Sequence, residues 1–395
     1  MKYDFDRIID RYNTGSLKYD TADSMGMPAD VLPMWVADMD FRAPDEVIER
    51  FDQLCKFGVY GYTVVTEDYF DAVRNWFSSR FNWEVERKWL VTSPGVVFAL
   101  ATAVKAFTDP GDGVLIQRPV YYPFTEVIEN NGRVVVSSSL RCENGAYTID
   151  FVDLESKLSR EDVKLMLICS PHNPVGRVWT RDELSEICRL CLKYNVKMVS
   201  DEIHADFVFT RREHLPLAAV SEQVADNCIV CTAPSKTFNL AGLQISNIFI
   251  PNREMRHAFR KEMKKTGFLG VNMAGQCVCQ AAYERGGEWL EQLKGYLTEN
   301  IKFLRAYINE HMPLIRITDT EGTYLVWLDM RELGLFDQKY FIVNKARLWL
   351  DTGTMFGEEG RGFERINVAC PRAVLEEALG RLKGAYDALI DEQNR

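Results

Sequence analysis

The sequence predicts an α/β fold with one large domain, built on a mostly parallel sheet covered by helices, and a smaller α+β domain. Strand-like apolar runs alternate with helix-periodic stretches from about residue 89 to residue 250, a pattern typical of a parallel sheet with helices on both faces. The pattern changes after about residue 287, where a long helical stretch and short strands follow. A chain of 395 residues also exceeds what one ordinary core organises. We therefore expect a large domain over residues 46–286 and a small domain formed by residues 1–45 and 287–395.

The expected elements follow in chain order. In the large domain, amphipathic periodicity predicts a helix over residues 68–81, and the strand-then-helix units begin after it. The expected strands there are residues 89–92, 114–116, 165–169, 196–200, 228–231 and 247–250, with helices over 96–107, from 124 and over 181–194. In the small domain the pattern predicts helices over 289–312 and from about 373, a strand over 322–329, and a glycine-rich loop over 353–362 that precedes residues 363–370.

Charge and composition exclude several classes of partner. The chain carries 47 basic and 57 acidic residues, a net charge of −10 with a pI near 5.2. This balance argues against a nucleic-acid or anionic-membrane surface. The first residues, MKYDFDRIIDRY, lack the apolar centre of a signal peptide, and no uncharged run is long enough to span a bilayer. We therefore expect a cytoplasmic protein with no membrane partner.

The ten cysteines are scattered and lie mostly in apolar segments. Cys188 and Cys191 form a C-x-x-C pair within a helix-periodic stretch, and no second cysteine or histidine pair nearby completes a zinc site. We expect all ten to be reduced thiols in the core, with no metal site.

The stretch CIVCTAPSKTFNLAG, residues 228–242, contains the first candidate functional residue. An apolar strand ends there and Lys236 follows it within small and hydroxyl residues. Open α/β sheets bind ligands at the carboxyl ends of their strands. Partial desolvation there would lower the pKa of the lysine and free a neutral amine to attack a carbonyl. A solvated surface lysine is the alternative.

Three further features lie just beyond predicted strand ends. Residues 93–97, SPGVV, open a helix whose free backbone N–H groups and dipole suit a phosphate. Asn173 lies in a proline-rich turn, where asparagine is also common for turn reasons alone. Asp201 ends an apolar strand, where an unpaired carboxylate would be costly. It needs a partner, and an arginine, a helix cap or a metal would each serve.

Pyridoxal phosphate meets all four demands, because it offers a phosphate, a phenolic oxygen, a ring nitrogen that a carboxylate stabilises as pyridinium, and an aldehyde for lysine. The residues around these positions resemble fold-type I pyridoxal-phosphate enzymes of the aminotransferase class I/II superfamily. Within it they are most similar to the MalY/PatB-type cystathionine β-lyases, or C–S lyases. The segments that carry the resemblance are residues 33–41, 170–176, 200–206, 235–240 and 367–372.

The resemblance assigns roles to the cofactor-binding residues. Lys236 would join the cofactor's aldehyde covalently and act as the catalytic base. Asp201 would hold the pyridinium nitrogen, Asn173 the phenolic oxygen, and Tyr121 would stack on the ring. The phosphate would lie on the backbone of Val96 and Val97 and on the hydroxyl of Ser235.

The resemblance also implies substrate contacts and a partner. Arg365 would bind the substrate carboxylate, a task that suits a planar guanidinium; the alternative is a surface ion pair. Tyr62 would reach the phosphate and the substrate from a neighbouring subunit, so a homodimer with shared active sites is implied.

Two positions depart from the common aminotransferase pattern. Where those enzymes carry a tyrosine three residues after the aspartate, this chain has His204, as the lyase branch does, and His204 is assigned to the cofactor site. Many aminotransferases place an arginine eight residues after the lysine, for the phosphate. Here that position is Gln244, so the phosphate has one positive charge fewer.

The expected activity is α,β-elimination on L-cystathionine or a related L-cysteine S-conjugate, which gives a thiol, pyruvate and ammonia. An aminotransferase that acts on an amino acid is the first alternative, because the same lysine can return its proton to the cofactor. The second is a cofactor-binding regulatory protein, since a fold does not fix a function.

Overall fold

The computed structural model describes residues 2–394 and is built on a seven-stranded sheet of order β2-β10-β9-β8-β7-β3-β4. Its strands are β2 (Leu90–Ser93), β3 (Gly113–Ile116), β4 (Val134–Ser137), β7 (Val163–Cys169), β8 (Lys197–Asp201), β9 (Cys228–Thr232) and β10 (Ser246–Phe249). The neighbours from β9 to β4 pair in parallel, and β10 pairs antiparallel with β9 and β2. The predicted α/β class with a mostly parallel sheet is confirmed.

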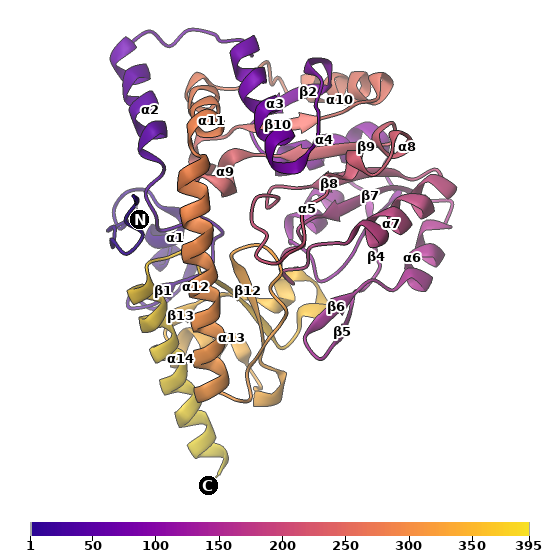
Figure 1. Ribbon diagram of the computed structural model, residues 1–395. Helices are drawn as coiled ribbons and strands as arrows, with labels where there is room; N and C mark the ends of the chain where they lie inside the picture. The colour runs from indigo at the N-terminus through magenta and orange to yellow at the C-terminus, as the bar shows by residue number, and fades with distance from the viewer. Residues whose placement is uncertain (1, 395) are drawn as a thin grey trace.

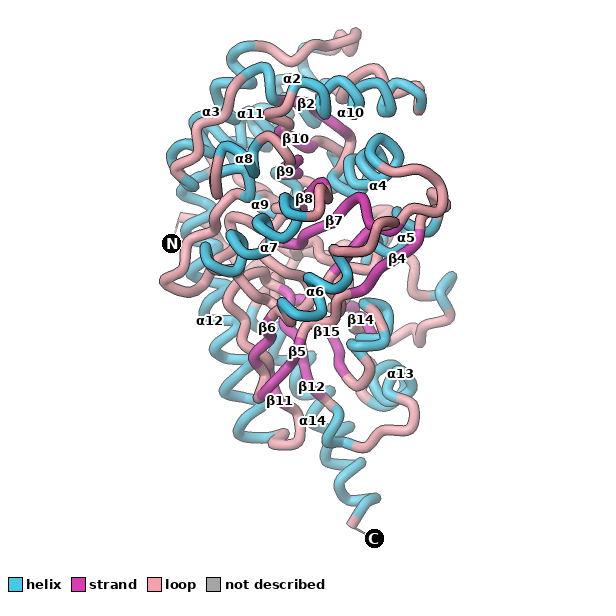
Figure 2. The backbone as a smooth tube through the Cα atoms, turned by 90° about the vertical axis from the view of Figure 1, so that its right-hand side faces the viewer, coloured by secondary structure: helices cyan, strands magenta, loops and turns pink. Residues whose placement is uncertain are grey.

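Helices cover both faces of this sheet because successive strand residues alternate between two cores. Val114, Leu165 and Ile229 pack with α4 (Val96–Phe107), α5 (Pro123–Glu129) and α10 (Arg253–Lys265). Leu115 and Met166, the next residues along, pack in the other core with residues of α6 (Phe151–Leu158), α7 (Arg181–Lys193), α3 (Glu67–Phe81) and α11 (Met273–Arg285). Figure 2 shows α6 and α7 on one side of the strands and α4 and α5 on the other. Residues buried on both faces explain why these strands are continuous apolar runs.

A four-stranded antiparallel sheet of order β11-β12-β15-β14 lies in the C-terminal part of the chain. Its strands are β11 (Arg316–Ile317), β12 (Leu325–Asp329), β14 (Asp351–Thr352) and β15 (Phe363–Asn367). The long helix α12 (Gly287–His311) packs against α14 (Arg372–Gln393), and the two run side by side in Figure 1. The short strand β1 (Leu32–Pro33) pairs in parallel with β13 (Leu348–Trp349), so the N-terminal segment joins the C-terminal one. The proposed domain boundaries at residues 45 and 286 stay a prediction.

The predicted small-domain strand over residues 322–329 is longer than the observed strand β12. β12 begins at Leu325 because Thr323 has a left-handed backbone (φ +64°) and Gly322 packs against the carbonyl of Phe207, where a Cβ would lie 2.8 Å from the oxygen. The glycine-rich segment forms two short 3₁₀ turns, η7 (Gly353–Phe356) and η8 (Glu358–Gly360).

Several elements have no counterpart in the sequence-based prediction, and β4, α6, α10 and α11, whose bounds are given above, are among them. The remaining elements are α1 (Leu17–Asp20), η1 (Asp23–Met25), α2 (Asp45–Phe57), η2 (Arg87–Trp89), β5 (Arg141–Glu143), β6 (Ala146–Thr148), η3 (Leu217–Ala219), α8 (Glu222–Ala225), α9 (Pro234–Thr237), η4 (Ala241–Leu243), η5 (Arg331–Leu333), α13 (Gln338–Tyr340) and η6 (Phe341–Lys345). Of these, only α2 corresponds to a pattern in the sequence, because a helical periodicity begins near Pro44. Most are single turns or two- to three-residue strands, too short for a periodicity to register.

All ten cysteines are free, but the expectation that all lie in the core is wrong for two of them. Cys55 is exposed and Cys142 is partly exposed. Cys55 lies on α2, an amphipathic helix whose only buried residue is Val47. Cys188 and Cys191 are buried on α7, as expected.

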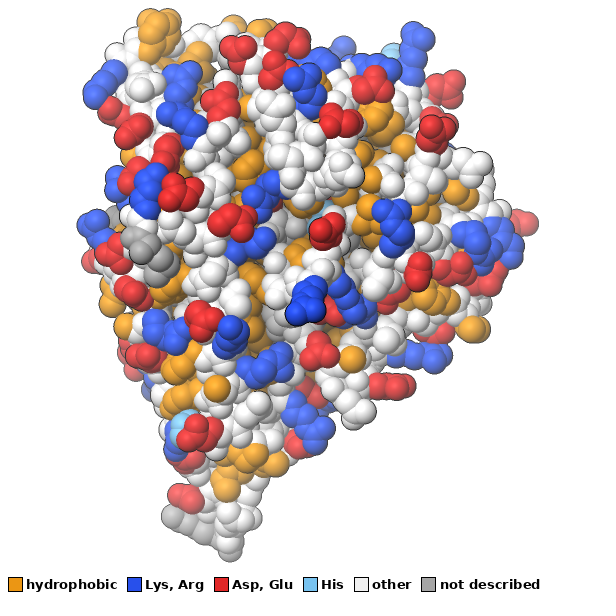
Figure 3. Space-filling view, viewed as in Figure 1, with side chains coloured by type: hydrophobic (Ala, Val, Ile, Leu, Met, Phe, Trp, Pro, Cys, Tyr) orange, Lys and Arg blue, Asp and Glu red, His pale blue; other side chains and the backbone are white. Residues whose placement is uncertain are grey.

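Charged side chains of both signs share the surface of the protein (Figure 3). Basic and acidic side chains are mixed over the face in Figure 3, with no large field of one sign. Within residues 2–394, no helix combines the length and the apolar character that crossing a membrane requires.

A buried charge network holds the segment of residues 37–40 that leads into the candidate site. The Lys18 side chain is fully buried, and its Nζ lies 2.8 Å from Asp40 Oδ2. Arg11 pairs with Asp40 at 2.7 Å and with Asp38 at 2.6 Å. A buried charge that loses its partner is strongly destabilising, so this network fixes the segment in place.

We expect Lys18→Met to lower the free energy of unfolding by about 3–5 kcal/mol, because it leaves the buried Asp40 with Arg11 alone. Thermal or urea unfolding measures the change. Lys56→Met is the matched control, since Lys56 is exposed and, among residues 2–394, forms an ion pair with Asp52 alone. Its expected cost is within about 0.5 kcal/mol. Equal losses in the two variants would contradict the role of Lys18.

Candidate active site

A cavity of about 190 Å³ lies at the carboxyl ends of the central strands, and all but two of the predicted site residues line it. Those that line it are Val96, Val97, Tyr121, Asn173, Asp201, His204, Ser235 and Lys236. Asp201 is the last residue of its strand, and the others lie in the turn or helix start that follows a strand. Parallel strands bring such positions to one edge of the sheet. The two exceptions are Arg365 and Tyr62.

Lys236 lies on α9, directly after β9, and its amine faces the cavity. Its Nζ donates a hydrogen bond to the carbonyl oxygen of Ala37 at 2.7 Å. Burial lowers the pKa of Lys236 to about 8, and the nearby carboxylate of Asp38 partly opposes this shift. A substantial neutral fraction is therefore available near neutral pH, as a nucleophilic or basic amine requires.

Asp201 is the last residue of β8, and its carboxyl group is buried at the cavity wall. It accepts a hydrogen bond from the backbone N–H of Ile203 at 3.1 Å. Burial raises the pKa of Asp201 to about 7, against the opposing effects of that hydrogen bond and of the charge on Lys236. In the described part of the chain no basic side chain forms an ion pair with Asp201. Because a buried charge without a partner is costly, a cationic group of a ligand would stabilise its ionised form.

Asn173 connects the cavity to the four-stranded sheet. Its Oδ1 accepts a hydrogen bond from Nη1 of Arg365, on β15, at 2.9 Å. The Arg365 side chain is buried over the ring of Phe356, with its Cζ 4.9 Å from the ring centroid, and forms an ion pair with Asp351. A surface ion pair, the alternative reading of Arg365, is therefore wrong.

His204 and Tyr121 line the cavity as neutral groups. Burial, together with the positive charges of Lys236 and Arg365, holds the pKa of His204 well below its usual value. Burial likewise raises the pKa of Tyr121 above its usual value. The Tyr121 backbone N–H donates to the carbonyl of Asn173 at 3.0 Å, which fixes the two residues relative to one another.

The first turn of α4 lines the cavity and is its candidate phosphate-binding part. Val96 and Val97 are its first two residues, Ser235 faces it, and Gln244 lines the same cavity. Unpaired backbone N–H groups at a helix start bind phosphate oxygens. Among the described residues that line the cavity, Lys236 is the sole cation, so a phosphate here depends on hydrogen bonds more than on charge.

Tyr62 lies elsewhere on the chain. Its side chain is fully exposed, and it lines a separate surface cavity of about 830 Å³ with Gly61 and Phe268. Within one chain Tyr62 does not join the site.

Sequence reasoning missed two groups that the structure places at the site. The carbonyl of Ala37 accepts from Lys236, and also from the hydroxyl of Tyr324 at 2.9 Å. Asp351 pairs with Arg365. A backbone carbonyl cannot be recognised from the sequence. The signal available there was the aromatic and acidic segment WVADMD, which contains Ala37. Asp351 lies on a strand of two residues, which periodicity does not reveal.

The residues present fit pyridoxal phosphate. The buried Asp201 lacks a cation that a pyridinium nitrogen would supply, and Lys236 offers an amine of lowered pKa in the same cavity. Asn173 has its Oδ1 held by Arg365, which leaves its Nδ2 hydrogens for a ligand oxygen. The helix start at Val96 suits a phosphate. The fold and this site together define a pyridoxal-phosphate enzyme of fold type I.

The chain belongs to the aminotransferase class I and II family, whose model matches residues 30–382. It is 42% identical to cystathionine beta-lyase PatB of Bacillus subtilis, over 96% of this chain and 99% of that protein. It is 33% identical to protein MalY of Escherichia coli, over 98% of this chain and all of that one. The predicted superfamily and its MalY/PatB branch are confirmed.

Solved structures agree with this assignment. Cystalysin from Treponema denticola, which contains a pyridoxal 5′-phosphate cofactor, superposes with a TM-score of 0.95 at 41% identity, over 98% of this chain and 100% of that one. The pyridoxal-phosphate-bound C–S lyase from Staphylococcus hominis gives a TM-score of 0.91 at 32% identity, over 97% and 98%. The cofactor predicted from the sequence is thus the cofactor of its relatives.

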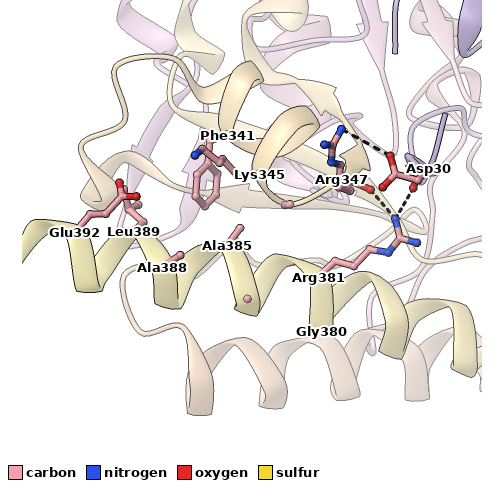
Figure 4. A pocket seen from close by; sticks show the side chains of 12 residues that line it. Asp30, Phe341, Lys345, Arg347, Gly380, Arg381, Ala385, Ala388, Leu389 and Glu392 are labelled. Atoms are coloured by element: carbon pink, nitrogen blue, oxygen red, sulfur yellow. Dashed lines mark hydrogen bonds and ion pairs between the residues drawn. The ribbon is translucent and has the colours of Figure 1, made fainter. Parts of the chain in front are cut away.

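A second cavity, of about 440 Å³, lies between α14 and η6 and is lined by none of these site residues (Figure 4). Its two arginines are already engaged within the chain. Arg381 donates to the carbonyl of Asp30 at 2.7 Å and pairs with Glu377, and Arg347 lies 3.7 Å from the Asp30 carboxylate. We assign no ligand to it.

Proposed function

We propose that this protein is a pyridoxal-phosphate-dependent carbon–sulfur β-lyase that cleaves L-cystathionine or related L-cysteine S-conjugates to a thiol, pyruvate and ammonia. The observation that supports this most is the juxtaposition of Lys236 and Asp201 in one buried cavity, with Arg365 hydrogen-bonded to Asn173 at its wall. The similarity to PatB over nearly the whole chain supports the lyase reaction in particular.

Each residue has a chemical task in this proposal. When bound, the cofactor supplies an electron sink for the electron pair left on the substrate's α-carbon. Lys236 would hold the cofactor and then, as a neutral amine, take the α-proton. Asp201 would keep the ring nitrogen protonated. Arg365 would bind the carboxylate of the substrate, so that the α-proton faces Lys236 and a thiolate leaves the β-carbon.

The binding tasks fall to neighbouring groups. The backbone N–H groups of Val96 and Val97, with Ser235 and the amide of Gln244, would hold the phosphate. Tyr121 would cover the ring face, and His204 would pack beside it as a neutral imidazole.

One incubation tests the function. The purified holoenzyme is supplied with a panel of cysteine conjugates that includes L-cystathionine, and free thiol, pyruvate, ammonia and other keto acids are measured. Elimination predicts equal amounts of thiol, pyruvate and ammonia. Keto acid formed in proportion to pyridoxamine phosphate would instead establish the aminotransferase alternative. The match to the aminotransferase class I and II family is the reason to test for it. Binding of the cofactor without turnover of any amino acid would indicate a regulatory protein.

We further propose a cytoplasmic homodimer whose sites are shared through Tyr62. Large apolar side chains are exposed in two neighbouring segments, and both contribute to the cavity of about 830 Å³ that contains Tyr62. They are Phe57, Val59, Tyr60, Tyr62 and Val64 in the first segment and Leu269 in the second. Exposed apolar patches of this kind mark interaction surfaces, and a second copy of the chain is the occupant that the family suggests.

We expect two inactive variants to restore activity when their subunits are mixed. Tyr62→Ala removes the residue that a chain donates, and Lys236→Ala inactivates the site that a chain builds. A mixed dimer then contains one intact site, because isologous contacts exchange the same residues in both directions. Activity of the refolded mixture, against each variant refolded alone, is the measurement. No recovery in a verified mixed dimer would contradict sharing.

A further inference from the structure

The inference concerns Asp351, the carboxylate that occupies Arg365. The two residues lie directly opposite one another on β14 and β15, and both side chains are 3% exposed. The hydrogen bonds of the guanidinium are largely used: Nη1 donates to Asn173 Oδ1 at 2.9 Å, and Nη2 donates to Asp351 and, at 3.2 Å, to the carbonyl of Trp35. In the described chain Nε is a buried donor without a partner.

A substrate carboxylate must therefore compete for a site that already holds one. Two carboxylates beside one guanidinium repel each other, and like charges at close range cost considerable free energy in a buried site. Asp351 has no side-chain hydrogen-bond donor other than Arg365 in residues 2–394, so loss of that contact leaves its charge uncompensated.

The surroundings of Asp351 favour its neutral form once a substrate carboxylate has replaced it at Arg365. Burial raises the pKa of Asp351, and the charge of Arg365 is what opposes that rise. Of the other titratable groups around it, Glu364 on β15 and Tyr121 and Tyr122 before α5 supply no positive charge. Lys339 and Arg361 are cations, but both are exposed to solvent, which screens their charge. They line, together with Asp337, a cavity of about 690 Å³ that Asp351 also lines, and a proton would reach the carboxyl group from this side.

We propose that Asp351 competes with the carboxylate of the substrate for Arg365, and that it takes up a proton when the substrate displaces it. Asp351 is thus a positioning residue. Without substrate it neutralises a buried guanidinium and keeps it aligned on Asn173, and it weakens the binding of every carboxylate that lacks further contacts in the site. The inference deepens the proposed function, since it rests on Arg365 as the carboxylate site.

A ligand that cannot react separates this inference from turnover. We choose 3-(methylthio)propionate, which has the carboxylate and thioether of a cysteine conjugate but no amine. Its binding to the holoenzyme is measured by calorimetry in buffers of different ionisation enthalpy, which counts the protons taken up. The absorption band of the bound cofactor is recorded in the same titration, so that any proton on the cofactor is counted separately.

We expect Asp351→Asn to bind this ligand about tenfold more tightly at alkaline pH, because the amide keeps an acceptor for Nη2 and removes the competing charge. The wild type should take up on the order of one proton more than the variant for each ligand bound. For a cysteine conjugate, KM should fall without a rise in kcat, as expected when ground state and transition state gain equally.

Glu364→Gln is the matched control. Glu364 is the neighbour of Arg365 on β15, is equally buried, and accepts a hydrogen bond from Gln338 rather than from Arg365. Burial raises the pKa of Glu364 to about 8, so glutamine resembles its neutral form. This control should leave affinity and proton uptake as in the wild type.

Equal or weaker binding by Asp351→Asn, or equal proton uptake, would overturn the inference. Should that variant fail to fold, the wild type provides the test. Its affinity for 3-(methylthio)propionate must fall as pH rises from about 6 to about 9, because binding takes up a proton. Affinity that is flat over this range, after the cofactor's proton is subtracted, overturns it. Turnover is measured separately. A protein without lyase activity could therefore still bind the carboxylate ligand as predicted, which distinguishes failure of the proposed function from failure of this inference.

Discussion

Replacing Lys236 with alanine should reduce lyase turnover by well over the roughly 10²–10⁴-fold that general base catalysis contributes. The expected loss is larger because one amine has two tasks, the covalent hold on the cofactor and the removal of the α-proton. Its position supports both. The amine is buried at a strand end, anchored by the carbonyl of Ala37, and has a pKa of about 8. Thiol release from L-cystathionine, measured with excess cofactor, is the assay.

Lys261→Ala is the control for this variant, because Lys261 is an exposed lysine on α10 and is not among the described residues that line the cavity. It should retain wild-type turnover. If Lys236→Ala kept turnover within about tenfold of the wild type, a factor below what a general base supplies, Lys236 would not have the proposed role.

Asp201→Asn should lower kcat/KM by on the order of 10²–10³-fold, the range seen when one electrostatic contact to a developing charge is removed. An amide cannot stabilise a protonated ring nitrogen as a carboxylate does, so the electron sink of the cofactor weakens. Steady-state kinetics with L-cystathionine measures this loss. Asp109→Asn, at an exposed aspartate, is the control and should leave kcat/KM unchanged. A loss below about threefold would contradict the role of Asp201.

The same substitution should stabilise the cofactor-free protein at alkaline pH. Asp201 has a pKa of about 7 when folded and about 3.9 when unfolded. The folded state therefore binds the proton more tightly than the unfolded state does. The stability that this proton binding contributes is lost as pH rises through 7. Asparagine does not ionise and avoids this loss. Cofactor-free Asp201→Asn should thus melt above the wild type near pH 8, and the difference should shrink towards pH 4. A lower melting temperature than wild type at pH 8 would contradict the cause given for this pKa.

Local sequence features were enough to predict six of the seven central strands, all but β4, and candidate residues at the edge of the sheet. Continuous apolar runs such as residues 165–169 and 228–231 are buried on both faces, so their composition alone indicates central strands. The groups that follow them, Asn173, Asp201 and Lys236, share one cavity because parallel strands end at one edge. Their roles came from a resemblance, which the family match and the relatives confirm at the level of fold and cofactor.

Contacts between distant segments were decided only by the tertiary structure. Arg365 reaches Asn173 across 192 residues, and Lys236 reaches the carbonyl of Ala37 across 199. Neither distance follows from periodicity, because each depends on how the four-stranded sheet and the N-terminal segment pack against the central one. The pairing of Asp351 with Arg365 depends on a two-residue strand. Short-range patterning and the family resemblance thus predicted the candidate site residues, whereas long-range packing decided their partners, their burial and hence their pKa values.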